Sequence, residues 1–162
     1  MLRPGMRAYL FPLAAGLALA VSAFLPWIVV GNDISLPGVP DTAALWIVGL
    51  GAAAVLLATL SMITRRNSRH PLLLVGLVAL GIMFLSWRIM PRAISNRALT
   101  RSQAVAIVDD VPVGEVPVVS VGYGMYIGLI ASIVLVAFGL TIVIKRASRP
   151  YVEAAAADDD VE

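Results

Sequence analysis

Four long uncharged stretches alternate with short charged segments along the chain. A helix needs about 20 apolar residues to cross the roughly 30 Å hydrocarbon layer of a bilayer. Because backbone polar groups in lipid must be satisfied within their own segment, such stretches are expected to be helical. The uncharged stretches cover residues 8–32, 42–64, 71–87 and 116–144. They predict four transmembrane helices, over residues 8–28, 43–64, 71–90 and 123–144.

Residues near the ends of these stretches are of the kinds that start or stop helices. Asp41 and Thr42 are good N-cap residues ahead of the second helix. Pro71 fits the first turn of the third helix, where its missing N–H has little cost. Pro26 is expected to loosen or end the first helix near Leu25.

The two segments beyond the first and third helices, residues 29–42 and 91–122, have a different character. Residues 91–103 have helical character, whereas residues 105–121 are rich in valine broken by turn residues, which predicts two or three short strands. Residues 28–30 and 34–36 are expected to pair with them. The predicted fold is an all-α transmembrane four-helix bundle with a small extracytoplasmic β-rich cap, too small to fold without the helices beneath it.

The composition supports lipid as the solvent. Hydrophobic residues make up 60% of the 162 residues and charged residues 14%, against about 25% charged in an ordinary soluble domain. That composition excludes a soluble enzyme and a soluble nucleic-acid binder. We expect one integral membrane domain, residues 1–149, followed by a disordered acidic cytoplasmic tail, residues 150–162.

The basic residues are divided unequally between the two sides of the predicted topology. Four arginines fall on the side of the cap, and eight basic residues fall on the other side. Positive charge favours the cytoplasmic side, so both termini are predicted to be cytoplasmic. The eight residues are Arg3, Arg7, Arg65, Arg66, Arg69, Lys145, Arg146 and Arg149.

The aromatic residues agree with this orientation. Trp27, Trp46, Trp87, Tyr123 and Tyr126 all fall at the outer ends of predicted helices. Amphipathic rings prefer the membrane–water interface, so these five are candidate outer-interface anchors. The alternative is that individual rings pack between helices.

The N-terminus has a competing interpretation. Arg3 and Arg7, the apolar stretch from Ala8 and the small residues 21–23 together resemble a secretory signal peptide with its cleavage site. The apolar run continues to Val30, which is longer than a usual signal core. Cleavage would leave three helices without inverting the others.

The sequence contains few residues that could form a catalytic, redox or metal-binding site. There is no cysteine and a single histidine, His70, which excludes disulfides and thiolate sites and argues against a histidine-rich metal site within one chain. The predicted spans contain no Asp, Glu, Lys or His, so their serines lack an activating base. We therefore expect no catalytic residue, no metal site and no cofactor.

Small residues at four-residue spacing are the clearest pattern within the spans. Gly124, Gly128 and Ser132 share one face of the last helix. In lipid, helices associate through close packing of such faces. This face is a candidate for helix packing or for an oligomer interface. Similar faces occur in the first helix (Gly16, Ala20) and the second (Gly49, Ala53).

Four arginines mark the segment after the third predicted span. On a helix, Arg88 and Arg92 would share one side, and Arg97 and Arg101 would fall roughly opposite. They are candidate contacts for anionic lipid or for a partner. The alternative is that water solvates them.

Two short stretches carry a resemblance. The segment 23–31, with Leu25-Pro26-Trp27 at its centre, and the segment 122–129 are similar to the first-helix exit and last span of small bacterial four-helix membrane proteins. Claudin-type tetraspans have a similar architecture, but their cysteine pair and glycine-leucine-tryptophan motif are absent. The resemblance implies an architecture in a bacterial inner membrane and no activity.

These observations favour a non-enzymatic structural or accessory subunit of a bacterial inner (plasma) membrane. Its expected partners are the lipid bilayer, a membrane-protein partner or a second copy of itself, and no nucleic acid. The alternative is a small oligomeric channel or transporter for a solute that needs no intramembrane charge.

Overall fold

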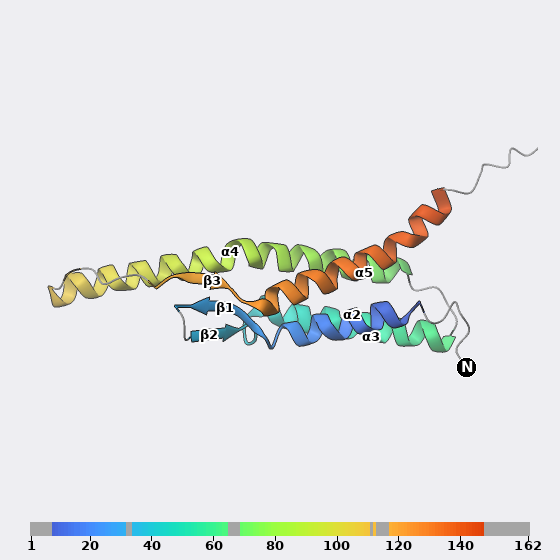
Figure 1. Cartoon of the computed structure of the whole chain (residues 1–162), viewed down its shortest axis with the longest axis horizontal. Helices are drawn as coiled ribbons and strands as arrows, with labels where there is room; N and C mark the ends of the chain where they lie inside the picture. The colour runs from blue at the N-terminus through green and yellow to red at the C-terminus, as the bar shows by residue number, and fades with distance from the viewer. Residues whose placement is uncertain (1–7, 32–33, 65–68, 111, 113–116, 148–162) are drawn as a thin grey trace, which may run out of the picture.

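A computed structural model describes residues 8–31, 34–64, 69–110, 112 and 117–147. Within these residues the chain forms four helices and a small sheet, arranged as an elongated molecule (Figure 1). The elements in chain order are α2 (Leu10–Ser22), β1 (Pro26–Val30), β2 (Ile34–Pro37), α3 (Thr42–Thr64), α4 (Arg69–Asp109), β3 (Val119–Val121) and α5 (Tyr123–Ala147).

Three of the described helices are long and apolar enough to cross a membrane: Thr42–Thr64, His70–Asp109 and Tyr123–Thr141. The predicted spans 43–64, 71–90 and 123–144 lie within helices α3, α4 and α5. The first predicted span, 8–28, is wrong in extent because α2 has only 13 residues.

Pro26 explains why α2 is short. In a continuing helix the N–H of residue 26 would bond to the Ser22 carbonyl, and proline has no N–H. The last turn instead tightens through three-residue hydrogen bonds, from Phe24 N to Val21 O at 3.0 Å and from Leu25 N to Ser22 O at 3.3 Å. The chain then leaves as a strand from Pro26.

The three strands form an antiparallel sheet in the order β2-β1-β3, which we call the cap. Val30 pairs with Ile34, and Val29 pairs with Ser120. The predicted pairing of residues 28–30 with a later valine strand is therefore confirmed, whereas residues 34–36 pair with residues 28–30 and not with the valine strand.

The predicted strand around Val105–Val108 is wrong. Those residues are helical because α4 continues without interruption through Pro91 to Asp109, a total of 41 residues. Asp110 ends the helix with a φ of 51°, the left-handed conformation common just after a helix C-terminus. Val111, Val113 and Val116, which were also part of the strand prediction, lie outside the described residues, as do Arg3, Arg7 and the tail from residue 150.

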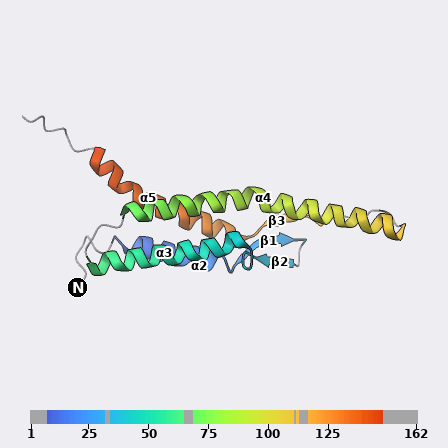
Figure 2. The same ribbon diagram turned by 180° about the vertical axis from the view of Figure 1, so that it is seen from behind.

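The helices pack in two pairs that also contact each other. Helix α2 lies against α3 and α5, and α4 lies against α5 and α3. Figures 1 and 2 show the cap at one end of these helices, with α4 running past it. The interior is filled by large apolar side chains that are fully buried, including Leu19, Ile47, Leu72, Met83, Met125 and Leu135.

Glycine allows the close approach of α2 and α3. A Cβ atom added to Gly51 would lie 2.7 Å from the Ala20 backbone nitrogen and 2.8 Å from the Gly16 carbonyl oxygen. Gly49, the residue expected from the sequence, has no atom within 4 Å of such a Cβ. The small-residue contact on α3 is therefore made by Gly51 and not by Gly49.

Candidate functional site

The face formed by Gly124, Gly128 and Ser132 lies inside the chain. A Cβ at Gly124 would be 2.7 Å from the Leu25 Cβ, and one at Gly128 would meet the end of the Met83 side chain and the Ser22 Oγ. Ser132 is fully buried, and all three residues lie among contacts within one chain. The face packs against other elements of the same chain, as in the helix-packing alternative.

The five aromatic candidates do not share one environment. Trp46, Tyr123 and Tyr126 are at least half exposed, and Trp87 is 37% exposed. These four rings can contact solvent or lipid. Trp27 is different, since only 1% of it is exposed. Its ring packs in the interior, which contradicts its expected role as an anchor.

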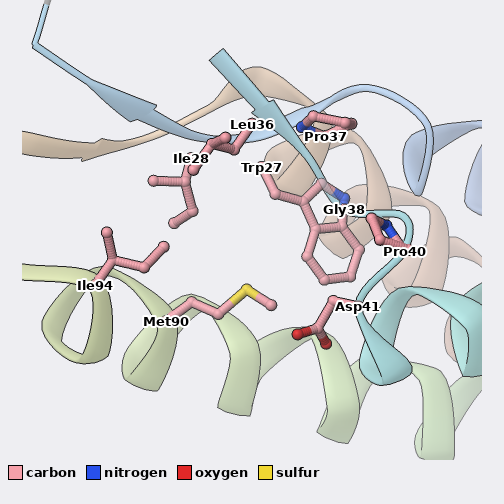
Figure 3. A pocket seen from close by; sticks show the side chains of 9 residues that line it. All are labelled: Trp27, Ile28, Leu36, Pro37, Gly38, Pro40, Asp41, Met90 and Ile94. Carbon is pink, nitrogen blue, oxygen red and sulfur yellow. The ribbon is translucent and has the colours of Figure 1, made fainter. Parts of the chain in front are cut away.

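Trp27 forms one wall of an open cavity of about 340 Å³ between the cap and α4, which we call the cap cleft (Figure 3). Ile28 on β1 and Ile94 on α4 lie on opposite sides of it, and Leu36 on β2 closes the top. Met90, one turn before Ile94, completes the α4 wall. Most of the lining is therefore apolar and comes from parts of the chain that are far apart in sequence.

The loop after β2 is held in place beside Trp27. Gly38 N donates to Leu25 O at 3.3 Å, and Val39 N donates to Ala23 O at 2.9 Å. A Cβ at Gly38 would lie 2.6 Å from the Trp27 ring. Only glycine permits this approach, so the loop fixes the indole against the cleft.

Asp41 carries the only charge among the described residues that line the cap cleft. Its Oδ1 accepts a hydrogen bond from Ala43 N at 2.8 Å, so it caps α3 as the sequence predicts. Figure 3 shows Asp41 and Met90 extending toward each other below the Trp27 ring. The cleft thus has apolar walls and an acidic rim.

The four arginines of α4 fall into two groups. All four are exposed, and Arg88 and Arg92 line a cavity of about 190 Å³ together with Trp87, Pro91 and Val121. Neither Arg97 nor Arg101 lines that cavity. The division agrees with the predicted helical spacing.

Sequence reasoning missed the cap cleft itself. The sequence predicts Asp41 as a helix cap and Leu36 as a strand residue, and it places neither of them in a cleft. The cleft depends on α4 passing beside the cap as one continuous helix, and the valines of residues 105–108 pointed to strands instead. No short-range pattern places Met90 and Ile94 opposite Ile28.

No protein-family model, curated protein or solved structure matches this chain.

Proposed function

We propose that the protein is a non-enzymatic accessory subunit of a bacterial inner membrane, and that it binds an extended segment of a partner membrane protein in the cap cleft. The observation that carries this proposal is the cleft. It is an open, mostly apolar cavity that three separate parts of the chain build beside the cap.

The edge of the sheet supports an extended ligand. Among the described strands, in the order β2-β1-β3, strand β2 pairs only with β1, and all four of its residues are exposed. An edge strand presents unpaired N–H and C=O groups, which an added strand can use. Leu36 on this strand also lines the cleft, so backbone pairing and side-chain burial would occur together.

The membrane location rests on the three long apolar helices and on the positions of charge. In the proposed arrangement α3, α4 and α5 cross the bilayer, and the shorter α2, which packs against α3 and α5, crosses it as well. Both termini face the cytoplasm, as the basic residues predict. The cap and the last part of α4 then lie on the outer side, where a partner can reach the cleft.

The packed interior favours this role over a channel formed by one chain. Most of the fully buried positions along the described helices hold apolar side chains such as Leu19, Met83 and Leu135, and the buried Ser22 and Ser132 hydroxyls donate to backbone carbonyls of their own helices. Solute flux into proteoliposomes that contain only this protein should equal the flux into empty liposomes. Flux above that level would favour the channel or transporter instead.

Site-specific photo-crosslinking in native membranes tests the partner site. A photoreactive residue at Leu36 should give one discrete adduct with another membrane protein. The matched control is Ile63, which is more exposed (76%) but lies near the far end of α3. No adduct at Leu36, or the same adducts from both positions, would contradict the proposal.

A further inference from the structure

The cavity lined by Arg88 and Arg92 has the composition of an anion site. Its other lining residues are Trp87, Pro91 and Val121, so none of the described residues that line it is acidic. Arg88 and Arg92 are one helical turn apart and about 40° apart around the axis. Two guanidinium groups therefore border one small concave surface, between α4 and strand β3.

The chemistry of arginine favours phosphate at this position. Each guanidinium offers five N–H donors in a planar fork, which matches two phosphate oxygens at once. Trp87 contributes an indole ring that is 37% exposed, and indoles prefer the interface between headgroups and acyl chains. Its ring contacts that of Phe84, with centroids 5.9 Å apart.

An apolar stripe continues from the two arginines along the same side of α4. At 100° per residue, its members all lie within about 60° of Arg88 around the axis. Each of them is exposed, and they extend about 17 Å along the helix. The stripe consists of Leu74, Leu77, Gly81, Phe84 and Leu85.

Gly81 leaves a gap in the middle of the stripe. A Cβ added there would meet no atom within 4 Å, whereas Leu77 and Phe84 on either side are each 53% exposed. The stripe therefore has a gap at Gly81, between the large side chains of Leu77 and Phe84. An acyl chain can contact the stripe along its length, whereas a free phosphate ion would make no contact with it.

We infer that this side of α4 binds one anionic phospholipid, with its phosphate between Arg88 and Arg92 and an acyl chain along the apolar stripe, over the gap at Gly81. The inference rests on the membrane location in the proposed function and is independent of the partner in the cap cleft. The bound lipid would fix the depth of α4 in the outer leaflet.

Arg97 and Arg101 provide an internal control. They have the same chemistry and exposure, but they lie on the opposite side of α4 and outside the cavity. The double variants R88Q/R92Q and R97Q/R101Q each remove two positive charges. Attraction of lipid by net charge alone would be reduced equally in both variants.

The test uses the full-length protein in detergent, titrated with phosphatidylglycerol, with phosphatidylcholine or with inorganic phosphate. Native mass spectrometry counts the retained lipid, and thermal unfolding gives the shift in Tm. Phosphatidylglycerol should raise the Tm of the unsubstituted protein and be retained at one molecule per chain. In R88Q/R92Q its apparent Kd should rise at least about tenfold, as expected for the loss of charge-assisted hydrogen bonds. R97Q/R101Q should behave as the unsubstituted protein does.

Two further measurements separate lipid binding from damage to the fold. Without added lipid, R88Q/R92Q should keep the Tm and far-UV spectrum of the unsubstituted protein. G81L should also weaken lipid retention, because its side chain would fill the gap in the stripe. The inference would be overturned if phosphatidylglycerol bound equally weakly to both arginine variants. It would also be overturned if phosphatidylcholine or inorganic phosphate raised the Tm as much as phosphatidylglycerol does. If lipid selectivity is lost but the Leu36 adduct still forms, the lipid site is wrong and the partner proposal is unaffected. If the Leu36 adduct is absent but lipid selectivity is found, the partner proposal is wrong and the lipid site is unaffected.

Discussion

The Ser22 carbonyl oxygen accepts a hydrogen bond from the Trp27 indole nitrogen at 2.8 Å. This is the carbonyl that Pro26 cannot reach, because proline lacks the N–H that a continuing helix would supply. Leu25-Pro26-Trp27 is thus a helix exit in which one residue stops the helix and the next gives a short hydrogen bond to a carbonyl that otherwise accepts only the 3.3 Å bond from Leu25 N. In an apolar interior, a poorly satisfied carbonyl is costly.

Replacing Trp27 with phenylalanine should therefore destabilise the fold. W27F keeps an aromatic ring but leaves the Ser22 carbonyl with only the 3.3 Å bond from Leu25 N, and the loss of one such hydrogen bond costs about 0.5–1.5 kcal/mol. Thermal unfolding in detergent measures the loss. The control is W46F, since Trp46 is 64% exposed and exposed substitutions usually change stability by less than about 0.5 kcal/mol. Equal Tm values for the two variants would show that the hydrogen bond contributes nothing.

The closely packed glycine on α5 should not tolerate a side chain. G128L would place its side chain against Met83 and the Ser22 Oγ, and overpacking of this kind typically costs about 1–3 kcal/mol. The Tm should fall without any change in oligomeric state, because the face lies inside one chain.

Glycine 49 is the matched control for that substitution. G49A should keep or raise the Tm, since its Cβ meets open space and alanine favours the helix by up to about 1 kcal/mol over glycine. A loss of oligomers in G128L at an unchanged Tm would instead support an interface between copies.

Removing the Asp41 cap should weaken the start of α3. D41A loses the acceptor for Ala43 N, and loss of such a cap costs about 0.5–2 kcal/mol. D41S should recover most of that stability because serine also accepts from the first turn. Hydrogen exchange of the first α3 amides reports the effect locally. Similar exchange in D41A and D41S would show that the cap does not stabilise this end.

The absence of cysteine from the chain allows the topology to be tested with single introduced cysteines. In intact cells a membrane-impermeant maleimide should label I107C, near the end of α4, where Ile107 is 82% exposed. H70C should react only after permeabilisation, because it lies at the opposite end of the helix. L77C should stay unlabelled in both cases although Leu77 is half exposed in the chain, since lipid would cover it. Labelling of L77C in membranes would contradict insertion of α4.

Periodicity and charge predicted three of the helices, because a long uncharged run that is expected to lie in lipid can satisfy its backbone polar groups within its own segment only as a helix. Pro26 was identified as a helix breaker, yet the first helix was still extended to residue 28, since hydropathy alone does not distinguish the strand Pro26–Val30 from a helix end. The valines before Asp109 favoured strands by propensity, and the continuous helix from the preceding span overrode them. Local preference is weak compared with propagation of an existing helix.

The candidate site was harder to predict from the sequence than the fold was. The spacing of Arg88 and Arg92 was sufficient to place them together, because both lie on one helix. The burial of Trp27 was not predictable, since it depends on Gly38 approaching the ring from a loop eleven positions later. The cap cleft has the same origin, in contacts between segments that no local pattern connects.

Because α4 is long, a small change in its tilt would move its far end by several ångströms. The part of the helix beyond Pro91 measures about 27 Å, and it is continuous with the part that would lie in the bilayer. A tilt of about 10° in the membrane would displace Asp109 by about 5 Å, while Met90 and Ile94, close to the pivot, would move much less. A change in bilayer thickness that tilts α4 would therefore move the end of the helix near Asp109, while the walls of the cap cleft would move very little.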